Sequence, residues 1–437
     1  MYKNIVFQKV MEIKREYIQN FQDIFYDFDE KNSRTCIEKW IEKLITVDEK
    51  YQEYRNIFKY LQLVQYNTKQ NVLLLIRYAN YSDIYSGEEE VTDEEFWKLY
   101  DGFYQECRSI VIDIKNDEII LLPFKKFFNI GQDPEVNYDN LEQYMKNAST
   151  LEISEKLDGS MFQARYIPKY DKIFTSTSQA LDENNSWRLK EANEMLNKLD
   201  VNLFTEYPNC TFVFEYISLK DAHVVCYKPE EQGLYLIGII NMNGHTYNYN
   251  YIKFIANFYK CKSMQIYNKT FEEMMEDIKN KKSNEQEGFV LNIDGKLLKL
   301  KTDDYVGIHK ILSKISSINL IIKNIADGTY DDLLSKIPTA YKSRIEKVAK
   351  VVFDYITEME TKTNTYYTLA PKQDKKTFML WVNVSVPSEL QSSVRNRYLG
   401  INNNYLKRGS GKTPQYIKLK QIIGDTKYSD IFIENTY

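Results

Sequence analysis

The chain carries charged residues on short apolar segments, in an order that could handle a nucleotide phosphate. Lys156 ends the alternating run LEISEK, and the turn residues Asp158-Gly159 follow before a second alternating run, FQARY. The pattern predicts a β-hairpin with a lysine beside its turn. Other charged residues are embedded in apolar runs, which indicates a cleft lined by charged side chains. They are Arg108, Lys126, Glu215, Glu287, Lys299 and Lys301.

This combination suits one kind of chemistry. An ordinary lysine has a pKa near 10.4 and is almost fully protonated at neutral pH. Neighbouring cations and a bound divalent metal lower the pKa of a lysine and so free its amine to act as a nucleophile. The same cations neutralise a polyphosphate, and carboxylates bind a metal or a ribose hydroxyl. We therefore expect Lys156 to attack a nucleotide phosphate; a Schiff-base lysine and a plain strand-end lysine are the alternatives.

A second segment, residues 287–301, lends itself to a geometric prediction. Asp294-Gly295 separates two strand-like runs and is a strong signal for a two-residue hairpin turn. With that turn, Gly288 faces Lys301, and Glu287 lies at the same end of the ribbon as the lysine. Strict alternation puts Glu287 on the opposite face, whereas a bulge would reverse it, so the facing stays open.

The whole chain predicts a multidomain α+β protein. At 437 residues it exceeds the size at which one core usually stops growing. Helical periodicity predicts a helical N-terminal extension over residues 1–65. Short β-rich runs with a few helices predict an α+β domain with a largely antiparallel sheet over 66–310. Helical periodicity then returns and predicts a helical C-terminal domain over 311–437.

Composition excludes several classes of protein. The five cysteines are scattered without a C-x-x-C and the three histidines lie far apart, which argues against a disulfide framework and a zinc site. No apolar run approaches the length of a membrane span, and the charged N-terminal segment is unlike a signal peptide. The expectation is a cytoplasmic protein without membrane contact.

The net charge of −4 argues against a surface that grips nucleic acid everywhere, but one local patch is basic. Residues 390–424 contain no acidic residue and interleave tyrosines with cations. Such a mixture serves single-stranded nucleic acid, and a solvated connection is the alternative. The cations singled out for RNA binding are Arg395, Arg397, Lys407, Arg408 and Lys412.

The ordered motifs resemble a known family. K-x-D-G (Lys156 to Gly159), the glutamate strand TFVFEYI, the E-G strand EGFV and the K-x-K strand KLLKLK occur in the order found in covalent nucleotidyltransferases, the polynucleotide ligases and capping enzymes. ECRSIVID, PFKKFFNIGQ and EKLDGS are further similar to the RNA ligases typified by that of T-even bacteriophages. The similarity covers roughly residues 70–310.

The resemblance implies a role for each matching residue. Lys156 would carry AMP, Lys299 and Lys301 would hold the α-phosphate, and Glu287 would organise the metal. The sequence departs from the family pattern at two places that would contact substrate or phosphate. Ala222 stands where the family tends to have a basic residue, and the hydroxyl-rich stretch 175–178 stands where it usually has a lysine. The residues implied to bind the nucleotide are Arg108, Lys126, Phe128, Asp158, Gly159, Glu215 and Tyr305.

The implied activity is that of an ATP-dependent RNA ligase with Mg²⁺ or Mn²⁺. It would join 3'-hydroxyl and 5'-phosphate RNA ends through a lysyl-AMP, most naturally in RNA repair. The expected partner is single-stranded or nicked transfer-RNA-like RNA, and the expected state is a monomer. The alternatives are a GTP-using capping enzyme, a DNA ligase, and a nucleotide- or RNA-binding module without turnover.

Overall fold

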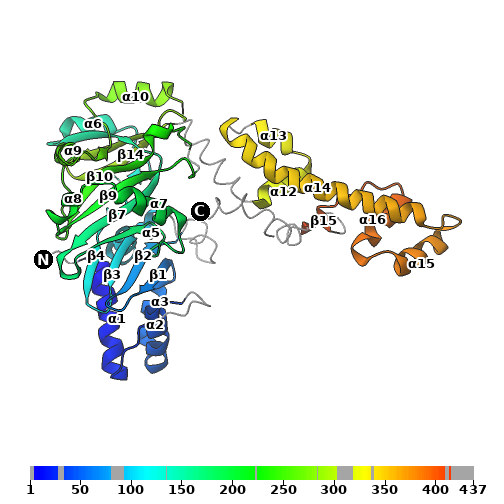
Figure 1. Ribbon diagram of the computed structural model, residues 1–437, viewed down its shortest axis with the longest axis horizontal. Helices are drawn as coiled ribbons and strands as arrows, with labels where there is room; N and C mark the ends of the chain where they lie inside the picture. The colour runs from blue at the N-terminus through cyan, green and yellow to red at the C-terminus, as the bar shows by residue number, and fades with distance from the viewer. Residues whose placement is uncertain are drawn as a thin grey trace. The chain divides into compact units, whose positions relative to one another are not determined.

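The computed structural model describes residues 4–27, 34–79, 93–133, 135–221, 224–282, 284–302, 318–335, 339–408 and 413–414. The chain divides into two compact units, residues 1–305 and 306–437 (Figure 1). The first unit is mixed helix and sheet with mostly antiparallel strand pairs, as predicted. No described helix is long and apolar enough to cross a bilayer.

Three helices begin the first unit and share a core with its first sheet. Asn4 caps α1 by accepting a hydrogen bond from the Phe7 amide at 2.8 Å, and Thr35 with Glu38 forms a capping box on α2. Apolar faces of these helices pack with β2 and β3 into one cluster that includes Trp40. The helices are α1 (Ile5–Phe21), α2 (Cys36–Val47) and α3 (Gln52–Phe58).

The first sheet shows where the predicted helical extension ends. A helix was predicted to run to residue 65, but residues 61–65 belong to β1, which pairs with β2, a strand whose first five residues are apolar and buried. A strand as buried as β2 needs backbone partners on both sides, and that tertiary demand overrides the local helical pattern. The sheet order is β1 (Leu61–Asn67), β2 (Val72–Tyr78), β3 (Arg108–Asp113) and β4 (Glu118–Leu121).

Two five-stranded sheets follow. One has the order β11 (Lys262–Ser263), β10 (Gly233–Asn241), β9 (Cys210–Ile217), β7 (Ser160–Ile167) and β8 (Lys172–Thr177). The other has the order β12 (Ile266–Tyr267), β6 (Leu151–Lys156), β13 (Gly288–Ile293), β14 (Lys296–Lys301) and β5 (Phe128–Asn129).

The strands β6 and β7 therefore do not form the predicted hairpin. Their connection, residues 157–159, passes from one sheet to the other. β6 pairs with β12 and β13, and β7 pairs with β8 and β9. A local turn signal was outweighed by partners that lie far away in the sequence. The consequence is that Lys156 lies where the two sheets meet.

The remaining helices of the first unit cover its sheets. They are α5 (Asp93–Glu106, interrupted at 99–102), α6 (Leu141–Asn147), α7 (Trp187–Leu196), α8 (Asn202–Thr205), α9 (Tyr249–Phe258) and α10 (Phe271–Asn280). Helices α7, α8 and α9 contribute to the apolar cluster that backs β7, β9 and β10.

The second unit is helical in its described part. A separate apolar cluster around Phe378 and Val382 joins its helices. Its elements are α12 (Ile318–Asp327), α13 (Tyr330–Ser335), α14 (Thr339–Leu369), α15 (Lys375–Ser385), α16 (Ser388–Tyr398), β15 (Lys407–Arg408) and β16 (Thr413–Pro414).

Candidate active site

Three neighbouring strands bring the predicted lysines into one row. The β13–β14 hairpin has the predicted two-residue turn, and it pairs Gly288 with Lys301. On its other side, β13 pairs Gly288 with Lys156 of β6. One residue of β13 is thus flanked by the two lysines, and Glu287 immediately precedes it. Strands distant in sequence converge on the carboxylate.

Glu287 lies between the two lysines. Its carboxylate accepts from the Lys156 ammonium at 2.5 Å and pairs with that of Lys301 at 3.0 Å. The residue is only 2% exposed. Gly288 explains the facing that the sequence left open: it has a φ of +150°, and a Cβ there would lie 2.0 Å from the Leu300 carbonyl oxygen. Only glycine fits this irregular backbone, which places Glu287 with the lysines.

The turn after Lys156 is held from both sides. The carboxylate of Asp158 accepts from the amides of Val224 and Val225 at 2.7 and 2.9 Å. The amide of Gly159 donates to Glu215 at 3.0 Å. A Cβ on Gly159 would lie 2.6 Å from the Tyr216 carbonyl oxygen, so the close approach to β9 requires glycine.

A pocket of about 250 Å³ opens beside Lys156. Arg108 and Lys299 reach it from different sheets, and each lies 4.4 Å from the centre of the Phe127 ring. Such contacts hold cations at an aromatic face in defined positions. The other lining residues include Glu155, Gly159, Glu215, Tyr249 and Met264.

The electrostatic setting differs from the predicted one. Burial disfavours the ammonium of Lys156, but Glu287, with Glu215 and Asp158, outweighs burial and raises the pKa of Lys156. The predicted lowering of a lysine pKa by neighbouring cations occurs at Lys299 instead, whereas carboxylates dominate at Lys156. Burial, followed by the charges of Arg108 and Lys126, holds the pKa of Lys299 well below its usual range. The sequence indicated a cationic cluster but not which lysine lies at its centre.

Glu287 itself is held as a carboxylate. Burial opposes its charge, yet Lys156 and Lys301 outweigh burial and lower the pKa of Glu287. The site thus contains one buried anion clamped by two cations, with a third cation, Lys299, nearby. A bound phosphate would bring negative charge to Lys299, whose pKa is lowered by burial and neighbouring cations.

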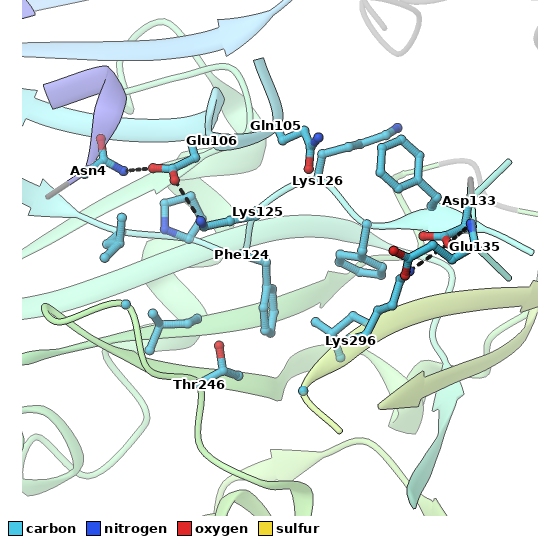
Figure 2. Close-up of a pocket in the computed structure, with 18 residues that line it drawn as sticks. Asn4, Gln105, Glu106, Phe124, Lys125, Lys126, Asp133, Glu135, Thr246 and Lys296 are labelled. Carbon is cyan, nitrogen blue, oxygen red and sulfur yellow. Dashed lines mark hydrogen bonds and ion pairs between the residues drawn. The ribbon is translucent and has the colours of Figure 1, made fainter. Parts of the chain in front are cut away.

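Lys126 and Phe128 lie in a neighbouring pocket of about 460 Å³ (Figure 2). The Lys126 ammonium lies 4.8 Å from the Trp97 ring centre. The two pockets share three lining residues, Phe124, Phe127 and Leu297, so they adjoin each other.

Two sets of charge pairs stand on opposite sides of this second pocket (Figure 2). On one side Lys125 pairs with Glu106, which also accepts from Asn4. On the other side Lys296 pairs with Asp133 at 2.8 Å and with Glu135 at 2.7 Å.

Other residues singled out in the sequence belong to the second unit or lie outside the described residues. Tyr305 and Lys412 are outside the described residues, as is Ala222. Arg395 and Arg397 are in the last turn of α16, and Lys407 and Arg408 form β15, all within the second unit.

Sequence patterns alone missed several side chains of the site. Phe127 lines the Lys156 pocket, whereas the resemblance implied Phe128; the adjacent phenylalanines of FKKFF carry no signal that distinguishes them. Asp221, 5% exposed, accepts from Ser160 at 2.9 Å and from Arg188 at 2.7 and 3.0 Å. The basic Arg188 thus lies, through Asp221, next to the turn after Lys156.

Comparison with known proteins places this site in context. Residues 106–306 match the family model described as RNA ligase. The chain is 24% identical over 281 residues to an inferred bifunctional polynucleotide kinase/RNA ligase of Autographa californica nuclear polyhedrosis virus, covering 59% of this chain and 37% of that protein. It is 29% identical over 128 residues to an inferred RNA ligase of Thermovibrio ammonificans, covering 29% and 32%. The chain spans about a third of the length of these curated relatives.

Similar solved structures include an archaeal ATP-dependent RNA ligase, with 11% identity, a TM-score of 0.40 and coverage of 72% of this chain and 80% of that one. The Naegleria gruberi RNA ligase with pyrophosphate has 20% identity, a TM-score of 0.32 and coverage of 42% and 56%. The family match over residues 106–306 confirms the resemblance that the motifs indicated.

Proposed function

From the premise that residues 106–306 match the RNA ligase family, we propose that this protein is an ATP-dependent RNA ligase. The Lys156 amine attacks the α-phosphorus of ATP, and pyrophosphate leaves. The AMP passes to an RNA 5'-phosphate, and an RNA 3'-hydroxyl then displaces AMP to form the phosphodiester. The observation that carries the proposal is the buried carboxylate of Glu287 paired with the half-buried Lys156 and Lys301, beside Lys299.

The pairing of Lys156 sets the first requirement of this mechanism. Because its pKa is raised, the lysine is an ammonium and must lose a proton before it attacks. Glu287 accepts a hydrogen bond from that ammonium at 2.5 Å, so it is placed to receive or relay the proton. Lys299 and Lys301 would then face the phosphate and stabilise the charge that develops on it.

The residues fit a divalent metal of the hard, oxygen-seeking type. Mg²⁺ is usually held by one or two carboxylates together with substrate phosphates and water. Among the described residues no group of three Asp, Glu, His or Cys side chains could hold an ion alone. The buried carboxylate of Glu287 would contribute one ligand for Mg²⁺ or Mn²⁺. When bound, the ion would neutralise phosphate charge.

The remaining nucleotide contacts follow from the two pockets. Glu215, which orders the Gly159 turn, would hold the ribose, with the adenosine in the pocket beside Lys156. Arg108 and Lys126 would hold the pyrophosphate as it leaves, since Lys126 lines the pocket that adjoins the first. Adjoining pockets suit a triphosphate that spans from one to the other.

We further propose that the chain acts as a monomer on single-stranded or nicked RNA, as in RNA repair. Residues 66–310 would serve as the adenylyltransferase domain, and residues 311–437 would present RNA. The cations Arg395 and Arg397 of α16 support this assignment, because basic and aromatic residues together suit single strands.

The test is incubation with ATP labelled at the α-phosphate and Mg²⁺ or Mn²⁺, followed by a denaturing gel. The proposal expects label on the protein from ATP, and sealing of 5'-phosphorylated RNA. Label only from GTP would indicate a capping-type enzyme, and sealing of DNA alone a DNA ligase. If neither nucleotide labels the protein, the ligase proposal fails, and a nucleotide- or RNA-binding module without turnover is the remaining candidate.

A further inference from the structure

Helix α9, with Tyr247 two residues before it, presents a row of aromatic rings at the surface of the first unit. Tyr247 stacks on Tyr251 at 4.9 Å, Tyr251 lies 6.4 Å from Phe254, and Phe254 lies 6.4 Å from Phe258. The planes of successive rings differ by only 21°, 32° and 29°. We call these four residues the α9 ladder. Phe254 is 61% exposed and Phe258 67%, so the rings at its outer end face solvent.

The ladder lies in a stretch of unusual charge. From Gly233 to Thr270 the sequence contains no Asp or Glu, and it contains four lysines, of which Lys269 is the last. Lys253 and Lys260 flank the outer rings in sequence. The carboxylate of Glu206, which comes from outside this stretch, accepts from the Tyr259 hydroxyl at 2.6 Å. The charge favours an anionic partner, and the exposed rings favour one with flat faces.

The ladder also continues from the site of chemistry. Tyr249, the first residue of α9, lines the pocket beside Lys156. Thr246, just before the ladder, lines the neighbouring pocket (Figure 2). The charge of Lys253 acts on Glu155, another lining residue of the first pocket. A chain leaving either pocket along α9 would meet Tyr251, and then Phe254 and Phe258.

We propose that the α9 ladder is a stacking platform for the bases of single-stranded RNA beside the joined ends, a proposal that rests on the proposed function. Exposed aromatic rings stack on bases whatever their sequence, and nearby lysines would neutralise the phosphates. Binding through this surface would let the ligase accept RNA of any base sequence next to the ends that it joins.

The test measures binding of the full-length protein to a fluorescein-labelled, 5'-phosphorylated single-stranded RNA by anisotropy, at several salt concentrations. Phe254→Ala/Phe258→Ala should weaken binding at least about tenfold without changing the salt slope, because stacking carries no charge. Phe254→Tyr/Phe258→Tyr should bind like the wild type, because it keeps the rings. Lys253→Gln/Lys260→Gln should instead flatten the slope, by roughly 0.7 for each phosphate that is no longer neutralised.

A matched control removes exposed apolar side chains elsewhere. Ile18→Ala/Val47→Ala on α1 and α2 should bind RNA normally. Labelling by ATP in each preparation reports on the proposed function separately: absence of labelling in the wild type would defeat the ligase proposal and leave the platform standing. Unchanged RNA affinity in Phe254→Ala/Phe258→Ala would overturn the proposed platform. A variant that changes only the self-association of the protein, and not its RNA affinity, would overturn it as well.

Discussion

Two lysines of the same site lie in opposite electrostatic settings. Lys156 is paired with the buried carboxylate of Glu287, so its pKa is raised. Lys299 is half-buried beside other cations, so its pKa is lowered. In the proposed mechanism Lys156 forms the covalent bond, and Lys299 binds a phosphate of the nucleotide. Without nucleotide, the crowded charge of Lys299 should lower the stability of the folded protein.

Replacing Lys299 by methionine should therefore stabilise the free protein. The side chain keeps its length and loses an unfavourable charge, so the melting temperature should rise by a few degrees while adenylation is abolished. The destabilisation by Lys299 is complete below its lowered pKa and disappears as the pH rises towards 10.5, the ordinary lysine pKa that applies to the unfolded chain. Melting curves at pH 7 and pH 10 should thus show the gain shrinking.

Lys296 of the same strand provides the control. Burial opposes its charge, but Asp133 and Glu135 outweigh burial and raise its pKa. Lys296→Met should lower the melting temperature or leave it unchanged at pH 7. Equal stabilisation by both substitutions would mean that charge crowding at Lys299 is not the cause.

At the scale of single residues, sequence identified the charged side chains but not their surroundings. Lys156, Glu287, Lys299 and Lys301 were found because each interrupts an apolar run in a known order. Their pKa directions and the choice between Phe127 and Phe128 depend on strands from distant parts of the chain. Alternation alone carries no information about which neighbours those strands will have.

At the scale of elements, one glycine determines how the β13–β14 hairpin presents Glu287. Gly288→Ala should destabilise the protein by more than about 2 kcal/mol, because its Cβ would overlap the Leu300 carbonyl and φ is positive. Adenylation should fall even where folded protein remains, because Glu287 would turn away from Lys156. Urea unfolding and ATP labelling measure the two effects.

The turn of the same hairpin is the matched control. Gly295 also has a positive φ, +88°, but a Cβ there would meet nothing within 4 Å. Gly295→Asn, a residue that tolerates this conformation, should cost little. If Gly288→Ala is as mild as Gly295→Asn, the irregular backbone at Gly288 does not orient Glu287.

Local signals predicted elements well where the partner strand was also local. The Asp294-Gly295 turn led to the correct pairing of Gly288 with Lys301. The Asp158-Gly159 signal failed, because β6 and β7 each find their partners elsewhere. The strand at residues 61–67 was missed although its partner β2 follows it directly, because no Pro or Gly separates the strand from the helix before it.

At the scale of the whole molecule, nucleotide chemistry is proposed for the first unit and RNA binding for both units. Removing the charge of Lys407, Arg408 and Lys412 together by glutamine should weaken RNA binding and reduce its salt slope. Labelling by ATP should be normal, because these residues lie outside the first unit. Unchanged affinity and slope would restrict RNA binding to the first unit.

The most direct test of the proposed chemistry is labelling of Lys156→Ala beside the wild type. With α-labelled ATP and Mg²⁺, the wild type should retain label on a denaturing gel and Lys156→Ala should retain none, while its melting curve stays near that of the wild type. Lys156→Ala should still seal an RNA strand that is already adenylated, because that step does not need the lysine as nucleophile. Label retained by folded Lys156→Ala would contradict the proposed chemistry, because another residue would then carry the AMP.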